Sequence, residues 1–372
     1  MTERGLRFEI LRECPQTRAR AGLLRTPHGV VETPVFMPVG TQGSVKGLTQ
    51  EMLEGELGVR ILLANTYHLL VRPGPDLIAA MGGLHRFMAW PRTILTDSGG
   101  YQVFSLNTLR KVTEDGVVFR SHLDGAEHRL TPESALEIQD ALGSDIRMVL
   151  DECTEYPATH EHARRSMERT AQWAERTFAR RPDRVFAIVQ GSMFADLRRE
   201  CARRLLELDA AGYALGGLSV GEPRSVSLEM VEATEDILPR DRPRYCMGVG
   251  MLGELGHYVA RGVDMMDCVL PTRNARNGYL FTSAGRIIIK HRRYRDDPRP
   301  IDPGCRCPAC ARYSRSYLRH LFLSGEILFA TLATCHNIWT YLDRMRQIRE
   351  AIMLGSLPHL LNTFRSQSVD EE

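Results

Sequence analysis

The sequence predicts an α/β protein whose core is a (β/α)8 TIM barrel with a small insertion near the C-terminus. Eight short runs of β-branched and apolar residues alternate with helical patterns between residues 33 and 269. Most runs are continuously apolar, as expected for parallel strands that are buried on both faces. Eight repeats of this kind are typical of a closed barrel. An open doubly wound sheet is the alternative, but it usually has fewer strands, and no GxGxxG motif follows the first run here.

The predicted strands are separated by helical segments or by longer insertions, and each ends near a polar or glycine residue. In chain order they are Thr33–Val39, Arg60–Asn65, Thr93–Asp97, Ile146–Asp151, Val185–Gln190, Tyr213–Gly217, Arg244–Gly248 and Met265–Val269.

Helices are predicted between these strands. Thr131 is a capping residue with Pro132 at the first helical position and an acidic first turn behind it, so a helix begins there. Residues 6–31 and 111–130 contain turn sequences and predict hairpins that interrupt the alternation. The other helical patterns cover His160–Ala179, Phe194–Leu208, Ser225–Ile237, Leu252–Arg261, Tyr317–Leu323 and Glu326–Met353.

Three parts follow from this order. Residues 1–278 are expected to form the barrel with its N-terminal and internal hairpins. Residues 279–336, which hold a cysteine cluster, are expected to form a metal-binding subdomain. Residues 337–372 would supply the closing helix of the barrel and a tail that is frayed from Ser366 onwards.

The composition is that of a soluble globular protein, with 43% apolar and 25% charged residues. Neither a signal peptide nor an apolar run of about 20 residues is visible, so no membrane contact and a cytoplasmic location are expected. The net charge of +2 is unevenly distributed. Residues 261–320 carry 13 Lys and Arg against 5 Asp and Glu, which predicts one local anionic partner unless the run is only a solvated surface.

A barrel enzyme has its active site at the carboxyl ends of its strands. Two predicted strands end at Asp97 and Asp151, the last one carries Asp267 near its end, and two end at the amides Asn65 and Gln190. A single acid there is readily explained as a helix cap, but three acids crowded in one cleft raise one another's pKa and predict a chemical role. Asp267 stands beside a basic segment, which suggests covalent chemistry on a nucleic acid.

The remaining polar groups at the strand ends complement a flat heterocycle. Asp151 can accept two hydrogen bonds, Gln190 can donate and accept, and Gly216-Gly217 offers bare backbone N–H groups, although this pair can also be an ordinary turn. Tyr101 supplies an aromatic face. This set fits a base with an N–H/NH2 edge and a carbonyl oxygen, which describes guanine.

The nine cysteines do not form a disulfide framework, because their number is odd and three are clustered. Cys305, Cys307 and Cys310 have the tight spacing of a zinc knuckle, and a closed tetrahedral site needs a fourth ligand. His336 is preferred for this position, and Cys335 and His320 are the alternatives. A site closed by four protein ligands leaves no position for water, so one structural Zn²⁺ per chain is expected.

With these motifs the chain resembles the bacterial tRNA-guanine transglycosylases, also called queuine tRNA-ribosyltransferases. The matching segments run in order over nearly the whole chain and are jointly specific. They are Asn65-Thr-Tyr-His-Leu, Thr96-Asp-Ser-Gly-Gly-Tyr-Gln-Val-Phe, Leu150-Asp-Glu-Cys-Thr, Gly216-Gly-Leu-Ser-Val-Gly-Glu-Pro, Asp267-Cys-Val-Leu-Pro-Thr-Arg-Asn-Ala-Arg-Asn-Gly, and the cysteine cluster with His336-Asn.

The resemblance implies a homodimeric pentosyltransferase of queuosine biosynthesis. Such an enzyme replaces guanine at the wobble position of GUN-anticodon tRNAs, within the uridine-guanosine-uridine run at positions 33 to 35, by the 7-deazaguanine preQ1. It implies Asp267 as nucleophile and Asp97 as general acid/base. The base would be read and sandwiched by Asp151, Gln190, Gly217, Leu218, Tyr101 and Met247, Cys153 and Val220 would set base specificity, Arg273 and Arg276 would contact the anticodon loop, and Cys305, Cys307, Cys310 and His336 would hold zinc.

Three other functions are weighed against this one. A barrel glycoside hydrolase usually displays several tryptophans to stack sugars, whereas this chain has three and none lies beside a predicted strand end. A non-catalytic tRNA-binding partner subunit would be expected to lack Asp267. A zinc hydrolase is disfavoured if protein ligands occupy all four positions on zinc.

Overall fold

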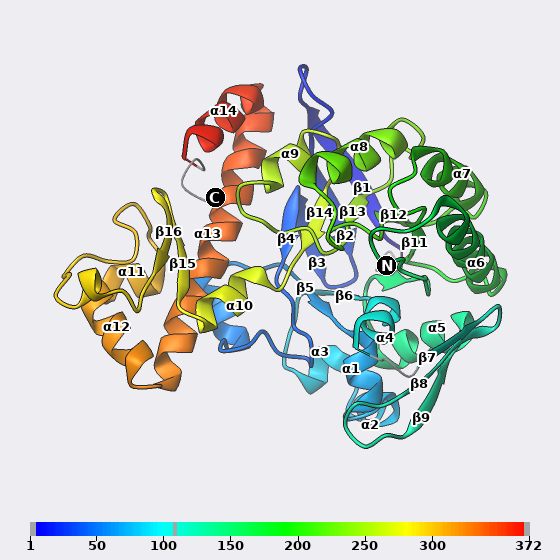
Figure 1. The fold of residues 1–372 in the computed structure, drawn as a ribbon, viewed down its shortest axis with the longest axis horizontal. Coiled ribbons are helices and arrows are strands. Elements are labelled where there is room, and N and C mark those ends of the chain that lie inside the picture. Colours follow the sequence, from blue (N-terminus) through cyan, green and yellow to red (C-terminus); the bar gives the residue numbers. More distant parts are fainter. Residues whose placement is uncertain (1–4, 107–109, 368–372) are drawn as a thin grey trace.

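The structure, a computed structural model, describes residues 5–106 and 110–367. Eight parallel strands close into a barrel, which confirms the predicted fold class (Figure 1). One sheet has the order β10-β11-β12-β13-β14-β4, and β5 pairs with β6. Single bridges from Val39 to Leu63 and from Leu95 to Ile146 join the two sheets at both seams. The strands are β4 (Val35–Met37), β5 (Ile61–Ala64), β6 (Thr93–Thr96), β10 (Arg147–Met148), β11 (Val185–Val189), β12 (Gly212–Leu215), β13 (Arg244–Cys246) and β14 (Met265–Asp267).

The apolar runs form strands because both of their faces are covered. Phe36, Ile188 and Met265 are fully buried between the barrel interior and the surrounding helices. Each observed strand overlaps its predicted run and ends earlier than predicted. The residues after each strand lead into the barrel mouth, so most polar residues there lie outside the ladder, whereas Asp267 still pairs with Met37 at the end of β14.

Helices surround the barrel (Figure 1). The helix predicted at Thr131 forms, and the Thr131 Oγ1 accepts a hydrogen bond of 3.2 Å from the backbone N–H of Ser134. Most of the helices that the sequence did not predict are short. The helices are α1 (Thr66–Val71), α2 (Pro75–Ala80), α3 (Gly83–Phe87), α4 (Gly100–Leu106), α5 (Pro132–Leu142), α6 (His160–Ala179), α7 (Ala195–Leu206), α8 (Arg224–Glu235), α9 (Leu255–Val259), α10 (Leu270–Arg276), α11 (Pro308–Arg312), α12 (Arg315–Leu323), α13 (Ile327–Leu354) and α14 (Leu357–Gln367), with a π-helix at Met52–Glu56 and a 3-10 helix at Arg292–Tyr294.

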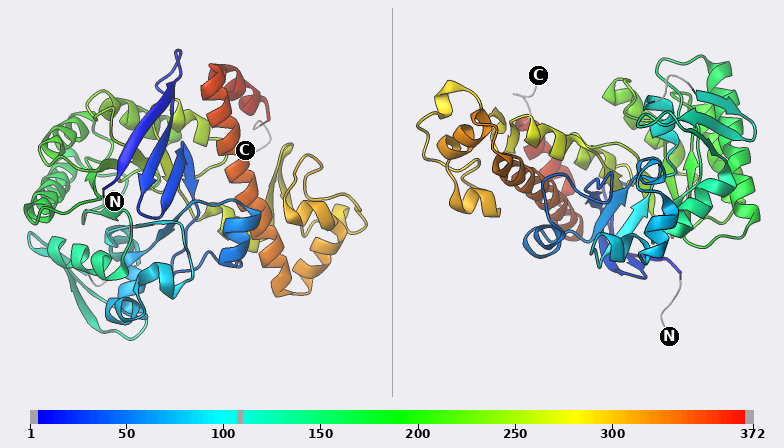
Figure 2. Two further views of the ribbon diagram at one scale, coloured as in Figure 1. Left: turned by 180° about the vertical axis from the view of Figure 1, so that it is seen from behind. Right: turned by 90° about the horizontal axis from the view of Figure 1, so that it is seen from below.

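Both predicted hairpin regions form three-stranded antiparallel sheets. One consists of β1 (Arg7–Glu13), β2 (Arg20–Thr26) and β3 (Gly29–Thr33) and crosses the end of the barrel where the strands begin (Figure 2). The other consists of β7 (Arg110–Thr113), β8 (Gly116–Arg120) and β9 (Glu127–Leu130) and is inserted after β6.

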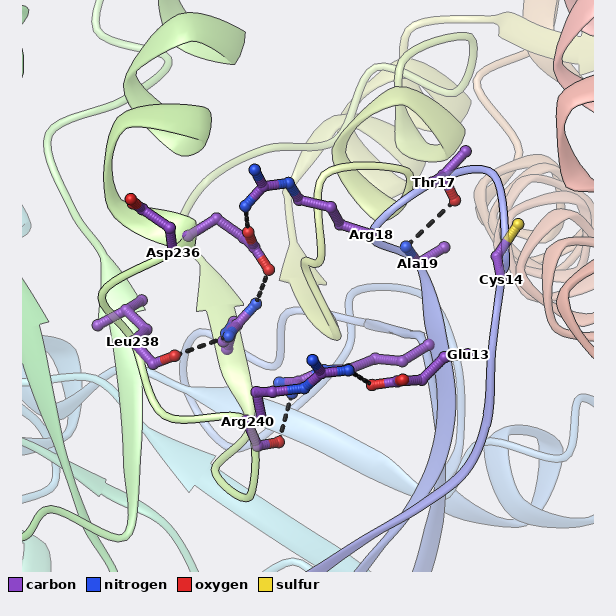
Figure 3. A pocket seen from close by; sticks show the side chains of 11 residues that line it. Glu13, Cys14, Thr17, Arg18, Ala19, Asp236, Leu238 and Arg240 are labelled. Carbon is purple, nitrogen blue, oxygen red and sulfur yellow. Dashed lines mark hydrogen bonds and ion pairs between the residues drawn. The ribbon is translucent and has the colours of Figure 1, made fainter.

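A polar cavity of about 440 Å³ lies under the first sheet (Figure 3). Its arginines are already paired: Arg20 with Asp264, Arg240 with Glu13, and Arg18 and Arg244 both with Glu235. These pairs fasten the sheet to the N-terminal ends of the strands. Because barrel active sites lie at the other end, this cavity is not the candidate site.

The cysteine-rich segment projects beside the barrel (Figure 1). It contains the hairpin of β15 (Tyr279–Thr282) and β16 (Gly285–Ile288), and its own small core includes Leu280, Ile301 and Leu318. Helix α13 belongs to both regions, because Phe329 packs in this small core and the Tyr341 hydroxyl donates to the Gly250 carbonyl beside the barrel at 2.6 Å. The expected boundary after residue 336 therefore falls inside one continuous helix.

The expectation of a frayed tail concerns residues 366–372. The first two of these residues continue α14, and residues 368–372 lie outside the described part of the chain. Among the described residues, no helix is both long enough and apolar enough to cross a membrane.

Candidate active site and metal centre

Asp267 is held at the end of β14 by two donors. Its Oδ1 accepts hydrogen bonds from the Tyr245 hydroxyl at 2.5 Å and from the Gly248 N–H at 2.9 Å. The carboxyl is 9% exposed, and burial raises its pKa above the ordinary value. Both donors bind Oδ1, and Oδ2 makes no hydrogen bond within the described residues. The carboxylate is thus oriented and keeps one oxygen for a reacting atom.

Asp97 directly follows β6, at the same mouth of the barrel. Its Oδ2 accepts a hydrogen bond from the Asn65 side chain, and its Oδ1 accepts one from the Thr66 N–H at 2.8 Å. Burial raises the pKa of Asp97 to about 6, and the negative charge of Asp267 contributes to this rise. A carboxyl with a pKa near 6 can give and take a proton near neutral pH, as general acid/base catalysis requires.

Asp151, Gln190 and the glycine pair form one connected group. The Gln190 Nε2 donates to the Asp151 Oδ2 at 2.8 Å, and the Ser98 hydroxyl donates to Oδ1 at 3.0 Å. The Gln190 Oε1 is buried without a donor among the described residues. Glycine is required at 217, because φ is +61° and an added Cβ would lie 2.5 Å from that Oε1. An unpaired buried acceptor is costly, so this oxygen marks a place for a donor on a ligand.

The other predicted base-binding residues surround this group. Tyr101 on α4 is 52% exposed, so it stands at the mouth. Leu218 is buried, and Met247 packs at the edge of the main core. Cys153 and Val220 are both half-buried. The loop that carries Val220 is pinned by Glu222, which accepts hydrogen bonds from the N–H groups of Ser219 at 2.6 Å and Val220 at 2.9 Å.

The two predicted RNA-contacting arginines lie on α10, directly after Asp267. Arg273 is exposed, and its positive charge acts on the Tyr101 hydroxyl, which places it at the same mouth. Arg276 is half-buried and donates to the Thr272 carbonyl at 2.9 Å. Burial and the charge of Arg273 lower the pKa of Arg276. Neither guanidinium forms an ion pair with a carboxylate in the part of the chain that the structure describes, so the two together favour an anionic ligand.

Sequence reasoning missed three supporting residues. Tyr245 is fully buried in β13, and a hydroxyl inside an apolar run was the only sign of it. Asn65 was recognised as a strand end but not as the partner of Asp97. Arg198 on α7 is fully buried, and its guanidinium donates to the carbonyls of Ser192 at 2.7 Å and Gly216 at 3.0 Å. Nothing in the helical pattern of Arg198 distinguished it from a surface arginine.

Cys305, Cys307, Cys310 and His336 gather into a cluster that can hold a metal ion. The three Sγ atoms lie 3.6, 3.5 and 3.4 Å from the His336 Nδ1. Tetrahedral zinc bound to thiolate and imidazole would separate these atoms by about 3.5 Å. The His336 Nε2 lies 2.6 Å from the Phe281 carbonyl oxygen. Because a carbonyl accepts, Nε2 carries the proton, and Nδ1 keeps its lone pair for a metal ion. Cys335 lies outside this cluster and packs in a different core.

Comparison with known proteins agrees with these features. The family model described as "Queuine tRNA-ribosyltransferase" matches residues 14–370. A relative of that name from Solibacter usitatus is 66% identical over 98% of both chains. Relatives of the same name from Koribacter versatilis and Thermoanaerobacter pseudethanolicus are 55% and 54% identical and cover 97% and 94% of this chain. The chain therefore belongs to the queuine tRNA-ribosyltransferase family.

Proposed function

We propose that this protein is a tRNA-guanine transglycosylase that exchanges the wobble guanine of GUN-anticodon tRNAs for preQ1. The observation that carries the proposal is the pair of buried carboxyls of Asp267 and Asp97, each oriented by donors and close enough for the charge of one to shift the pKa of the other. Beside this pair stands a polar group that complements a guanine edge. We further propose that the protein is cytoplasmic, which fits tRNA as its substrate.

The exchange proceeds by double displacement. The free Oδ2 of Asp267 attacks C1′ of the ribose, the glycosidic bond breaks, and guanine leaves with a proton from Asp97. The incoming preQ1 returns a proton to Asp97, attacks C1′ and releases the Asp267 carboxylate. A nearby carboxylate stabilises the oxocarbenium-like transition state and can trap it, as in retaining glycosidases. The covalent intermediate lets two bases use one pocket in turn.

The pocket reads the base by hydrogen bonds and stacking. Asp151 accepts from the N–H/NH2 edge, and the Gly217 N–H donates to the carbonyl oxygen. The unpaired Gln190 Oε1 provides a further acceptor for the base edge. Tyr101 and Met247 cover the two faces of the ring, and Leu218 lines its edge. The nucleotide must leave its stack, which a single-stranded anticodon loop allows at low cost.

The metal centre and the oligomeric state complete the proposal. Zn²⁺ bound to Cys305, Cys307, Cys310 and His336 would stabilise the subdomain and take no part in the chemistry. A homodimer is supported by an exposed apolar surface on α12 and α13, where Leu323 is 57% and Ile327 84% exposed.

The test is incorporation of labelled guanine into an unmodified GUN-anticodon tRNA transcript, followed by a chase with preQ1. Incorporation that preQ1 displaces irreversibly is expected. Exchange without displacement would retain the mechanism and refute preQ1 as the second base. If tRNA binds but no guanine enters it, the protein is a non-catalytic binding partner. Release of phenol from a simple chromogenic glycoside would instead point to a glycoside hydrolase.

Val220→Gly should widen the choice of base. Val220 and Cys153 are half-buried beside the pocket, and the loop of Val220 is fixed by Glu222, so the side chain occupies a constant volume. Removing its three carbons should allow a bulkier 7-substituent such as that of queuine. The ratio of kcat/KM for queuine and preQ1 should rise about tenfold or more. An unchanged ratio would remove Val220 from the specificity residues.

Asn65→Ala should move the pH dependence of exchange to higher pH. The Asn65 amide donates to the ionised Asp97 and so lowers a pKa that burial has raised to about 6. Without this donor the charged form loses a hydrogen bond and the pKa rises further. The limb of the kcat/KM profile that reports Asp97 should therefore move to higher pH. Gln102→Ala is the comparison, because Gln102 is a weaker donor to Asp97 and its removal should move the same limb by less. A profile that is unmoved in both variants would contradict the role of Asp97.

A further inference from the structure

Arg198 is a fully buried cation that forms no ion pair with a carboxylate of the described residues. The charge of Glu222 acts on it from a distance, and no hydrogen bond joins the two. Burial lowers the pKa of Arg198 to about 10, so the guanidinium is still charged at neutral pH. Its Nη1 has no acceptor in the described part of the chain. A buried charge without a counterion costs stability, so folding alone gives little reason for an arginine here.

The guanidinium joins the loops that follow two neighbouring strands. Its Nε donates to the Ser192 carbonyl after β11 at 2.7 Å, and its Nη2 donates to the Gly216 carbonyl after β12 at 3.0 Å. The Gly217 carbonyl lies 3.4 Å from the same Nη2. Ser192 has a φ of +50°, in the left-handed region that residues with a side chain rarely adopt. Because the guanidinium is planar and its donors have fixed directions, it holds these two loops at a set separation.

The Gly216 carbonyl belongs to the same peptide unit as the Gly217 N–H, which the proposed function assigns to the base. This peptide bond is trans, so its C=O and N–H point in opposite directions. With the carbonyl directed at Arg198, the N–H points away from that side chain. Gly217 is buried, and its N–H donates to no acceptor within the described residues. A Cβ added to Gly216 would lie 2.6 Å from the Gln190 Nε2, so this peptide packs directly against a base-reading side chain.

Two consecutive glycines do not by themselves fix the direction of this peptide. Without a Cβ on either side, the peptide plane can turn over at little steric cost. The turned peptide would present the Gly216 carbonyl to the pocket, where it would repel a carbonyl oxygen of the base and accept from an amino group. It would also take an acceptor away from a buried guanidinium, which is costly. Arg198 therefore opposes the turned state.

We propose that Arg198 is a positioning residue that holds the Gly216–Gly217 peptide with its N–H toward the base. The pocket then selects a carbonyl group over an amino group at that edge of the purine. A charge-assisted hydrogen bond on the carbonyl also polarises the peptide and makes its N–H a stronger donor. This inference rests on the proposed function, and Arg198 acts through the peptide rather than by contact with the base.

The experiment measures binding of labelled guanine to the full-length zinc-loaded protein by equilibrium dialysis, with guanine or 2,6-diaminopurine as the unlabelled competitor. The second base carries an amino group where guanine has its carbonyl oxygen, and the wild type should prefer guanine. Arg198→Met keeps an unbranched side chain but removes the charge and every donor. It should weaken guanine binding about five- to tenfold and leave 2,6-diaminopurine binding unchanged or tighter. The ratio of the two dissociation constants should therefore fall by at least that factor.

Arg199→Met is the matched control, because Arg199 lies on the same helix but donates to the Ala233 carbonyl and pairs with Asp236. Its ratio should equal that of the wild type. Arg198→Lys keeps the charge but has a single ammonium group for the two loops, so its ratio should lie between those of the wild type and Arg198→Met. Arg198→Lys also decides the question if Arg198→Met does not fold.

Equal weakening of both bases in Arg198→Met would show that the residue only supports the pocket, and it would overturn the proposed role. A wild-type ratio in Arg198→Met would do the same, as would a wild-type ratio in Arg198→Lys where the methionine variant does not fold. These measurements concern base binding and need no tRNA. If the wild type binds guanine but incorporates none into tRNA, the proposed function fails, and the selection of the base by Arg198 can still be read.

Discussion

Asp267→Asn should abolish the covalent RNA–protein adduct and reduce guanine exchange to below roughly a thousandth of the wild-type rate, a loss of about 4 kcal/mol in transition-state stabilisation. The amide has nearly the same shape as the carboxyl. Its oxygen can still accept the hydrogen bonds that the Tyr245 hydroxyl and the Gly248 N–H now donate to Oδ1. The neutral amide lacks the charge and nucleophilicity needed to attack C1′.

The measurement is denaturing electrophoresis of enzyme incubated with labelled tRNA, together with the exchange rate and the melting temperature. Burial penalises the charged form of Asp267, so the neutral variant should melt no earlier than the wild type. Binding of tRNA should persist, because Arg273 and Arg276 are untouched. An adduct that survives in Asp267→Asn would assign the nucleophile to another residue.

Tyr245→Phe provides a graded comparison. It removes one of the two donors to Asp267 and leaves the carboxylate in place. The adduct should still form, but more slowly, because the Oδ2 lone pairs are less well oriented and one charge-stabilising hydrogen bond is lost. A variant as inactive as Asp267→Asn would show that Tyr245 does more than orient the carboxylate.

The barrel was predictable because its strands are buried on both faces. Runs such as Val185–Val189 are apolar throughout and stop at a polar residue. The same pattern located Asp97, Asp151 and Asp267 without any structure, since parallel strands of a barrel deliver their ends to one mouth. The cysteine spacing was equally informative, because three thiolates within six residues can hardly avoid one another.

The residues that orient these groups were not predictable, because their partners are distant in the chain. Tyr245 meets Asp267 across neighbouring strands, and Asn65 meets Asp97 across 32 positions. Arg198 reaches the Gly216 carbonyl from the preceding helix, α7. No local pattern specifies such a contact, which depends on strand register and side-chain direction. The short helices α1–α4 were missed for a similar reason, since elements of five to seven residues carry too few periodic positions to be detected.

Helix α13 is shared by the cysteine-rich subdomain and the barrel. The sequence predicted this helix correctly but divided it, assigning His336 to the subdomain and residues from 337 on to the barrel. In the structure Asn337 bridges the two, because its Oδ1 accepts from the Phe281 N–H at 3.2 Å and its Nδ2 donates to the Pro271 carbonyl at 3.0 Å. The candidate metal ligand His336 and the bridge between subdomain and α10 are therefore consecutive residues of one helix.

Cys307→Ala should remove the bound metal and unfold the subdomain around it. Cys307 is fully buried, and its Sγ also accepts the Cys310 N–H at 3.3 Å, so it belongs to both the ligand set and the turn. Structural zinc in small folds contributes an apparent binding free energy of about 10 kcal/mol or more, which three remaining ligands cannot supply. Metal content measured by mass spectrometry should fall from one equivalent to none, with a loss of solubility.

Cys335→Ala is the matched control, because it removes a buried thiol next to His336 that lies outside the four-residue cluster. It should keep one equivalent of zinc and lose only the packing of one sulfur atom. If Cys307→Ala keeps its metal, the three cysteines of the knuckle are wrongly assigned as ligands. If Cys335→Ala loses its metal, His336 is wrongly assigned as the fourth ligand. Loss of metal in Cys307→Ala should also weaken tRNA binding, since Asn337 couples α13 to α10 and to the arginines there. The metal would then act on catalysis only through the position of Arg273 and Arg276, at a distance from Asp267.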